Sequence, residues 1–246
     1  TLRSGKSRFV GLIVSDSSNP YYGRVISGVE ETLSEKNYNL LIFNNNEDIQ
    51  KEEKFLHDLM SVNVAGVILT PALGNAQSPA FLREAGIKYV LAHRYVYLHE
   101  DNYVVADDVM AGYIATKHLL GRRQGPIIFI NGNNNVSAAR DRYQGYLKAL
   151  TESGVPIEAG NGYYSGIRQE DGYAIGNQIA VRLAPPYSIL CFSDYVATGA
   201  MKALRDRGIT VPNQVAVMGI DDIEMFSYMT PGLTTVHIPK KEIGRT

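Results

Sequence analysis

Two adjacent carboxylates, Asp221 and Asp222, follow an apolar run that is suited to a buried strand. The run is Val215–Met218, and Gly219 is expected to let the chain turn after it. Ligands are held at the carboxyl ends of strands in an open α/β sheet, so an acid there can accept hydrogen bonds from a polar small molecule. The position of Asp221 therefore predicts a ligand contact, whereas Asp222 is expected only to cap the following turn.

Two adjacent tyrosines, Tyr21 and Tyr22, stand at the start of an expected helix. Asn19 or Ser18 can cap this helix with Pro20 in its first turn, which gives those residues a structural duty. The tyrosines differ because an aromatic ring can stack on a sugar or base while its hydroxyl donates a hydrogen bond. We expect at least one of them to contact a ligand. The alternative is that they pack against a neighbouring lobe.

Two further pairs lie where an expected helix begins. Asp107 and Asp108 head the helix expected over Val109–Leu120. An acid in the first turn stabilises a helix by capping and by its attraction to the helix dipole, but two acids are more than capping requires. Ser193 and Asp194 occupy a comparable strand-to-helix junction. All four residues are therefore candidates for a polar site.

The composition is that of an ordinary globular chain. Its 246 residues are 45% apolar and 20% charged, with a net charge of −1. Such a chain has little electrostatic attraction for nucleic acid or an anionic membrane, so we do not expect this portion to grip DNA. The single cysteine, Cys191, excludes an internal disulfide and is expected to be a small buried hydrophobe. No apolar run approaches the roughly 18 residues of a membrane span.

Motifs of catalysis and metal binding are missing from the sequence. The five histidines show neither H-E-x-x-H nor Cys/His metal spacing, and G-x-S-x-G and G-x-x-x-x-G-K-[ST] do not occur. We therefore expect no enzyme activity, no cofactor and no metal. His93 is the exception among the histidines because it follows the expected strand Tyr89–Ala92.

Short apolar runs alternate with helix-like stretches along the chain. The expected strands are Phe9–Val14, Leu40–Phe43, Gly66–Leu69, Tyr89–Ala92, Tyr103–Val105, Ile127–Ile130, Ile189–Phe192 and Val215–Met218. The expected helices are Tyr21–Glu35, Glu52–Val62, Pro79–Ala85, Val109–Leu120, Ala138–Ser153, Gln169–Leu183 and Ala197–Arg207, with Gly86, Gly121, Gly154 and Gly208 just past four of them. Continuously apolar strands indicate parallel sheets that are covered on both faces. The pattern divides near residues 104–108, so we predict an α/β protein of two Rossmann-like lobes joined by a hinge.

The segment from residue 211 resembles a known family. It reads V-P-N-Q-V-A-V-M-G-I-D-D, with Pro231 and L-T-T following about ten residues later. This pattern is similar to the effector-binding domain of LacI/GalR-type bacterial transcription regulators. The segment S-D-S-S-N-P-Y-Y at 15–22 is also similar to the family's S-x-x-N-P-[YF]-[FY].

The resemblance implies the type I periplasmic-binding-protein fold, in which the chain crosses between the lobes more than once and the ligand lies in the cleft. Residues 8–108 would form the N-terminal lobe, rejoined by 237–246, and residues 109–236 the C-terminal lobe. Residues 1–7 resemble a linker from a helix-turn-helix headpiece that this chain does not contain.

The resemblance also implies roles for single residues. Arg142 lies in a segment similar to s-x-x-R-x-x-G-[FWY] and corresponds to the arginine that reaches the effector. The alternative is that it forms surface salt bridges with Asp141 or Glu170. Asp107 would lie at the cleft, and Asp108 takes the place of a more usual Asn.

Three more cleft positions follow from the resemblance. Ser193 stands where the family often has Asn, which would alter a hydrogen bond to the effector. Ile167 falls where many members present an aromatic wall, and its aliphatic side chain is a weaker stacking surface. His93 lies at a strand end where the family places a cleft residue.

The function predicted from these patterns is that of a switch. The chain would be the effector-binding and dimerisation domain of a cytoplasmic LacI-type regulator that forms a homodimer and does not bind a membrane. A sugar, polyol or nucleoside-like effector would change its affinity for operator DNA, which it would contact only through the headpiece. The alternative is a periplasmic sugar-binding protein of a transport system, which would share the cleft chemistry.

Overall fold

The computed structural model describes residues 7–96, 101–122, 125–157, 162–164 and 166–246, and it divides into two compact α/β units. Unit 1 comprises Thr1–Ala106, Asn135–Ser137 and Pro239–Thr246, and unit 2 comprises Asp107–Asn134 and Ala138–Ile238. Most of the linker predicted at 1–7 lies outside the described residues. In the part of the chain that is described, no helix is long and apolar enough to cross a membrane.

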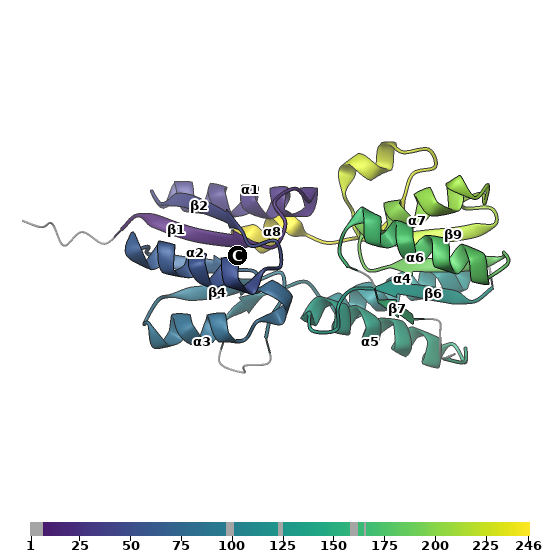
Figure 1. Ribbon diagram of the computed structural model, residues 1–246, viewed down its shortest axis with the longest axis horizontal. Helices are drawn as coiled ribbons and strands as arrows, with labels where there is room; N and C mark the ends of the chain where they lie inside the picture. The colour runs from purple at the N-terminus through teal and green to yellow at the C-terminus, as the bar shows by residue number, and fades with distance from the viewer. Residues whose placement is uncertain (1–6, 97–100, 123–124, 158–161, 165) are drawn as a thin grey trace, which may run out of the picture. The chain divides into compact units, whose positions relative to one another are not determined.

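Unit 1 is built on one parallel sheet with the strand order β2-β1-β3-β4-β5 (Figure 1). Its strands are β1 (Phe9–Val14), β2 (Asn39–Asn44), β3 (Gly66–Leu69), β4 (Tyr89–Ala92) and β5 (Tyr103–Val104). Its helices are α1 (Pro20–Glu35), α2 (Ile49–Ser61), the short 3-10 helix η1 (Ala72–Gly74), α3 (Gln77–Glu84) and α8 (Lys240–Arg245). Buried Ile13, Leu59 and Leu91 join strands to helix in its core, as continuously apolar strands require.

Helix α8 returns to unit 1 from the far end of the sequence and lies beside α1. The two backbones approach closely at two glycines: a Cβ on Gly28 would lie 2.2 Å from the carbonyl oxygen of Lys241, and a Cβ on Gly244 would lie 2.1 Å from that of Val25. Glu31 also pairs with Lys241 and with Arg245 across this contact. Close packing and charge together hold the returning segment in place.

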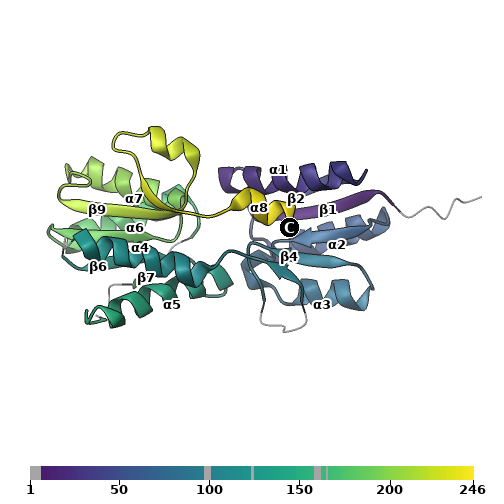
Figure 2. The ribbon, with the colours of Figure 1, turned by 180° about the vertical axis from the view of Figure 1, so that it is seen from behind.

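Unit 2 contains a second parallel sheet, with the strand order β10-β9-β8-β6-β7. Its strands are β6 (Ile127–Asn131), β7 (Gly162–Tyr164), β8 (Tyr187–Cys191), β9 (Val215–Asp221) and β10 (Thr234–His237). Its helices are α4 (Asp108–Arg122), α5 (Ser137–Glu152), α6 (Gln169–Arg182), α7 (Asp194–Asp206) and the 3-10 helix η2 (Glu224–Tyr228). Helix α4 covers one face of this sheet, and α6 with α7 covers the other (Figure 2).

The predicted fold class and the predicted strands and helices are confirmed, whereas β7, β10 and α8 were not predicted from the sequence. Two predictions for single glycines are wrong. Gly121 was expected just past a helix and lies inside α4. Gly219 was expected to let the chain turn and lies inside β9, where a Cβ would be 2.2 Å from a carboxylate oxygen of Asp194. Gly219 is therefore needed for a close approach rather than for a turn. Cys191 is buried in β8 as predicted.

Candidate functional site

Arg142 forms the centre of a buried group in unit 2 that we call the arginine cluster: Asp108, Arg142, Phe192 and Asp221. Its Nε donates to a carboxylate oxygen of Asp108 at 2.7 Å, and its Nη2 lies 3.6 Å from a carboxylate oxygen of Asp221. Its Nη1 donates to the carbonyl oxygen of Phe192, whose ring centroid is 4.7 Å from the guanidinium carbon. Because Arg142 is only 1% exposed, the alternative of a surface salt bridge is wrong.

The packing of α4 against α5 sets the distance between Asp108 and Arg142. A Cβ on Gly112 would lie 2.0 Å from the carbonyl oxygen of Arg142, and a Cβ on Gly145 would lie 2.0 Å from that of Val109. Only glycine allows such an approach of two backbones. Asp108, the first residue of α4, is thereby brought within hydrogen-bonding distance of a side chain 34 residues further along the chain.

The electrostatics of the arginine cluster reflect its burial. Desolvation raises the pKa of Asp108, and the charge of Arg142 opposes this rise, while Asp141 and Asp107 add to it. Two carboxylates thus face one guanidinium in a place that is shielded from water. Such a cluster can accept hydrogen bonds from a ligand and can hold it in a fixed orientation.

Asp221 and Asp222 end β9 in unusual backbone conformations. Their φ angles are 137° and 56°, a region that residues other than glycine rarely adopt and that recurs at functional sites. The Asp221 carboxylate is buried beside Arg142, whereas Asp222 is exposed and lies 2.8 Å from Nδ1 of His237. The two neighbouring acids therefore face different surroundings.

Asp194, at the start of α7, fixes the chain that follows β9. Its fully buried carboxylate accepts from the backbone N–H of Ile223 at 2.8 Å and from the hydroxyl of Thr235 at 2.6 Å. The same hydroxyl accepts from the backbone N–H of Asp222 at 3.1 Å. Asp194 thus couples α7, the end of β9 and β10.

In unit 1, polar and aromatic side chains meet at the carboxyl ends of β1 and β4; we call this group the tyrosine cluster: Ser15, Tyr21, Tyr22, His93 and Arg94. The hydroxyl of Tyr21 lies 2.9 Å from Nδ1 of His93, and their ring centroids are 4.6 Å apart. The hydroxyl of Tyr22 bonds to that of Ser15 at 2.5 Å. His93 has a φ of 70°, so this strand end is also strained.

Arg94 is the buried cation of the tyrosine cluster, and a Glu47 carboxylate oxygen 2.9 Å away balances its charge. The Arg94 side chain also donates to the carbonyl oxygen of Pro71 and to the hydroxyl of Ser15. Burial raises the pKa of Tyr22 to about 12, although the charge of Arg94 opposes the shift. Tyr22 is therefore a neutral donor and acceptor at physiological pH.

The remaining predicted site residues are not members of the arginine cluster or the tyrosine cluster. Asp107 is exposed, and its carboxylate accepts from the backbone N–H of Met110 at 2.8 Å, as a helix cap does. Ser193 is buried and caps α7 by accepting from the backbone N–H of Val196 at 3.3 Å. Ile167 lies half-buried before α6, and no contact described for it joins it to either cluster. Within the described residues, no three His, Cys, Asp or Glu side chains are arranged to hold a metal ion.

The arrangement of two parallel-sheet units has a match among known protein families. Residues 7–246 match the family described as "Periplasmic binding proteins and sugar binding domain of LacI family". The chain belongs to this family.

Individual LacI-family relatives resemble nearly the whole chain. The ribose operon repressor of Haemophilus influenzae is 29% identical over 245 residues, which cover 100% of this chain and 74% of the repressor. The transcriptional regulator DegA of Bacillus subtilis is 31% identical over 246 residues, which cover 99% of this chain and 73% of DegA. Among solved structures, a complex of the regulator CelR with cellobiose matches with a TM-score of 0.89 at 28% identity, covering 98% of this chain and 75% of that one. These relatives are transcription regulators, which supports the LacI-type function over the transport alternative.

Sequence reasoning missed several residues of this LacI-family chain that the structure places at the two clusters. Glu47 follows β2 in a run of polar residues that carries no distinct signal. Phe192 was treated as part of a strand, and its ring and carbonyl contacts with Arg142 were not predicted. Asp108 is a candidate from the excess of acids at a helix start, but its pairing with Arg142 was not predicted.

Proposed function

We propose that this chain is the effector-binding domain of a bacterial transcription regulator and binds a small sugar or sugar-like molecule. The observation that carries the proposal is the arginine cluster, in which Arg142 of α5 pairs both with Asp108 and with Asp221, the last residue of β9. Carboxylates and a guanidinium give a hydroxylated ligand charge-assisted hydrogen bonds of about 1.5 to 3 kcal/mol each.

The tyrosine cluster of unit 1 is itself suited to a ligand of the same class. The rings of Tyr21 and Tyr22 and the imidazole of His93 are suited to the apolar faces of a sugar, and their polar atoms are suited to its hydroxyls. Two relatives support the ligand class, since one is a ribose operon repressor and the other, the regulator CelR, was solved in complex with cellobiose. We assign ligand contacts to these residues and to Arg142 and Asp221, with Ser193, Asp107 and Ile167 as secondary candidates.

The proposed output is a change in operator affinity without any enzymatic step. An effector shifts a conformational equilibrium only by its different affinities for the two states. Asp222 and His237 link the end of β9 to β10, next to the segment that leads back to unit 1 at Pro239. A strain change at Asp221 would reach that segment through these contacts. Contact with DNA is assigned to a separate headpiece, because a net charge of −1 disfavours nucleic-acid binding by these residues.

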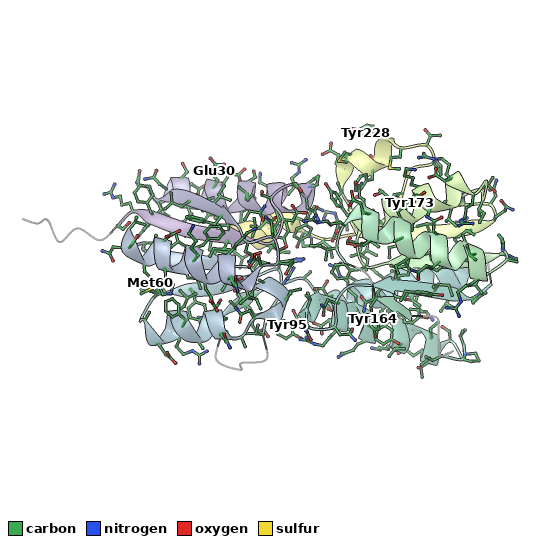
Figure 3. The ribbon with its side chains drawn as sticks, viewed as in Figure 1. Glu30, Met60, Tyr95, Tyr164, Tyr173 and Tyr228 are labelled. Atoms are coloured by element: carbon green, nitrogen blue, oxygen red, sulfur yellow. The ribbon has the colours of Figure 1, made fainter. Side chains whose placement is uncertain are left out.

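We also propose a cytoplasmic homodimer. Apolar side chains are exposed on η2, where Tyr228 is 80% and Met225 is 56% exposed (Figure 3). Such side chains are suited to burial between two copies of a chain. Sedimentation velocity of the parent and of Tyr228→Ser checks this: the parent should sediment as a dimer, and a monomeric parent would contradict the proposal.

A thermal-shift screen against sugars, polyols, nucleosides and amino acids tests the ligand class. A ligand at a hundredfold excess over its dissociation constant should stabilise the protein by about 2.7 kcal/mol. Asp221→Asn should weaken its binding at least about tenfold. Asp206→Asn is a matched control because Asp206 is at the opposite end of α7 from the cluster. If the ligand binds Asp221→Asn and Arg142→Lys as tightly as the parent, the assigned site is wrong.

A further inference from the structure

A cavity of about 220 Å³ lies between α2 and α3 of unit 1 and shares no residue with either cluster. Because a cavity of about 150 Å³ is enough for a benzene ring, this one is large enough for a ring that carries a short chain. The residues that line it are Glu53, Leu56, His57, Gln77, Ser78 and Phe81.

Hydrogen bonds within unit 1 fix the polar floor of the cavity. Ser78 is buried, and its hydroxyl accepts from Nδ2 of Asn75 at 3.0 Å and bonds to the carboxyl group of Glu52. The fully buried Glu52 also accepts from Nδ2 of Asn45 at 2.8 Å and from the backbone N–H of Ala72 at 2.6 Å. Ser78 is thereby held in place, as in a ligand site that is formed before the ligand arrives.

The walls of the cavity are apolar and aromatic. Leu56 is a buried member of the core of unit 1, and Phe81 packs against that core. The ring of His57 meets the ring of Phe81 edge to face, with centroids 5.0 Å apart and an angle of 60° between the planes. A third ring in the cavity gains apolar contact and further ring-to-ring contacts of this kind. The walls therefore favour an aromatic ligand.

The charge at the cavity favours a cation. Glu53 is exposed at its rim, and none of the described residues bonds or pairs with the Glu53 carboxylate. A cation can therefore bind there without displacing another group. An anion finds little support at the start of α3, because the backbone N–H of Gln77 already donates to Oδ1 of Asn75 at 3.0 Å and Pro79 has no N–H.

We propose that this cavity binds a small aromatic amine, with its ring against Leu56, His57 and Phe81 and its ammonium group against Glu53. The inference goes beyond the proposed function, because it adds a second small-molecule site that lies wholly within unit 1. The ring supplies most of the affinity through apolar contact, and the ammonium group supplies the selectivity.

Saturation-transfer NMR titrations at pH 8.0 with four matched probes test this inference. The probe 2-phenylethylamine carries both the ring and the charge, and it should bind with a dissociation constant of about 1 mM. Two probes each lack one feature: 2-phenylethanol has no charge, and butylamine has no ring. Each should bind at least about threefold more weakly than the aromatic amine. Phenylacetate reverses the charge and should bind most weakly.

Two variants separate the charge from the aromatic wall. Glu53→Gln keeps the size of the side chain, so 2-phenylethylamine should bind about three- to fivefold more weakly while 2-phenylethanol is unaffected. His57→Ala removes a ring and should weaken both probes by a similar factor. Glu30→Gln, on α1, makes the same change at an exposed glutamate that does not line the cavity, and it should bind all probes as the parent does (Figure 3). Circular dichroism checks that the variants are folded.

The outcomes separate this inference from the proposed function. A dissociation constant above about 10 mM for 2-phenylethylamine, or equal binding of 2-phenylethanol, overturns the inference. Parent affinity of Glu53→Gln for the amine also overturns it, because the selecting charge then lies elsewhere. Asp221→Asn should bind the amine as the parent does. If it does not, the amine occupies the proposed effector site, and the second site is wrong while the proposed function stands.

Discussion

The arginine cluster of unit 2 and the tyrosine cluster of unit 1 occupy the same kind of position, the carboxyl ends of parallel strands, but differ in the groups that contact their arginine. In unit 1, Arg94 pairs with one carboxylate, that of Glu47, and the same cluster contains the contacting rings of Tyr21 and His93. In unit 2, Arg142 faces two carboxylates and one ring. The carboxyl ends of parallel strands thus support an arginine with one carboxylate and several rings in one unit, and an arginine between two carboxylates in the other. The fold fixes the positions, and the side chains fix the chemistry.

The largest expected effect is on the free energy of unfolding when each buried arginine is replaced. Arg142→Met leaves Asp108 and Asp221 buried without their cation, and we expect a loss of about 3 to 5 kcal/mol in the free energy of unfolding. Arg94→Met leaves only Glu47, which still accepts from the backbone N–H of Leu73, so the expected loss is about 1 to 3 kcal/mol. Urea denaturation followed by circular dichroism measures both losses.

The double variant Asp108→Asn/Arg142→Met serves as the control for this prediction. It removes the charge of one of the two carboxylates that Arg142→Met leaves without their cation. It should therefore recover part of the lost free energy of unfolding. Equal losses for Arg142→Met and Arg94→Met would show that the second carboxylate of the arginine cluster has no energetic consequence.

Alkaline pH should destabilise unit 1 through Tyr22. Burial raises its pKa from 10.0 to about 12, so the folded state holds this proton more tightly than the unfolded chain does. The resulting stability is fully present below about pH 10 and is lost as the pH rises through about 12. Between these values the parent should lose about 2 to 3 kcal/mol more than Tyr22→Phe.

Urea denaturation at a series of pH values measures this difference. Tyr228→Phe is the matched control, because Tyr228 is 80% exposed and its removal should leave the pH dependence of the parent unchanged. Parallel pH curves for the parent and Tyr22→Phe would contradict the assignment.

Separating α4 from α5 should affect the arginine cluster specifically. A Cβ on Gly145 meets the carbonyl oxygen of Val109 at 2.0 Å, so Gly145→Ala must push the helices apart and should cost about 1 to 3 kcal/mol. It should also weaken effector binding, because Asp108 and Arg142 move apart. Nothing lies within 4 Å of a Cβ on Gly23, so Gly23→Ala in α1 should stabilise by about 0.5 to 1 kcal/mol. Titration calorimetry and urea denaturation would contradict this if both variants behaved alike.

The strands that the sequence predicts are those with unbroken apolar runs, such as Phe9–Val14. Strand β10 was missed because its residues, Thr234–His237, are largely polar and its position at the sheet edge leaves them partly exposed. Strand β7 is likewise short and at an edge. Apolar periodicity identifies what is buried on both faces and gives little signal at the margins of a sheet.

Candidate site residues were found where they follow a strand, as Asp221 and His93 do. The Asp108–Arg142 contact could not be derived in this way, because it depends on two glycines that let α4 and α5 approach. Local patterns locate the end of each strand, but they do not show which distant side chain packs against it.

Ser193 provides the smallest test, because capping and ligand contact predict different results. Its hydroxyl caps α7 as Asn19 caps α1, so Ser193→Ala and Asn19→Ala should each cost about 1 kcal/mol of unfolding free energy. Because Ser193 is also a predicted ligand contact next to Phe192, Ser193→Ala should in addition weaken effector binding about tenfold, which Asn19→Ala should not. Ser193→Asn keeps a capping oxygen and should restore stability. If titration calorimetry gives the parent affinity for Ser193→Ala, the hydroxyl serves the helix alone, and the polar contacts of unit 2 with the effector are confined to the arginine cluster.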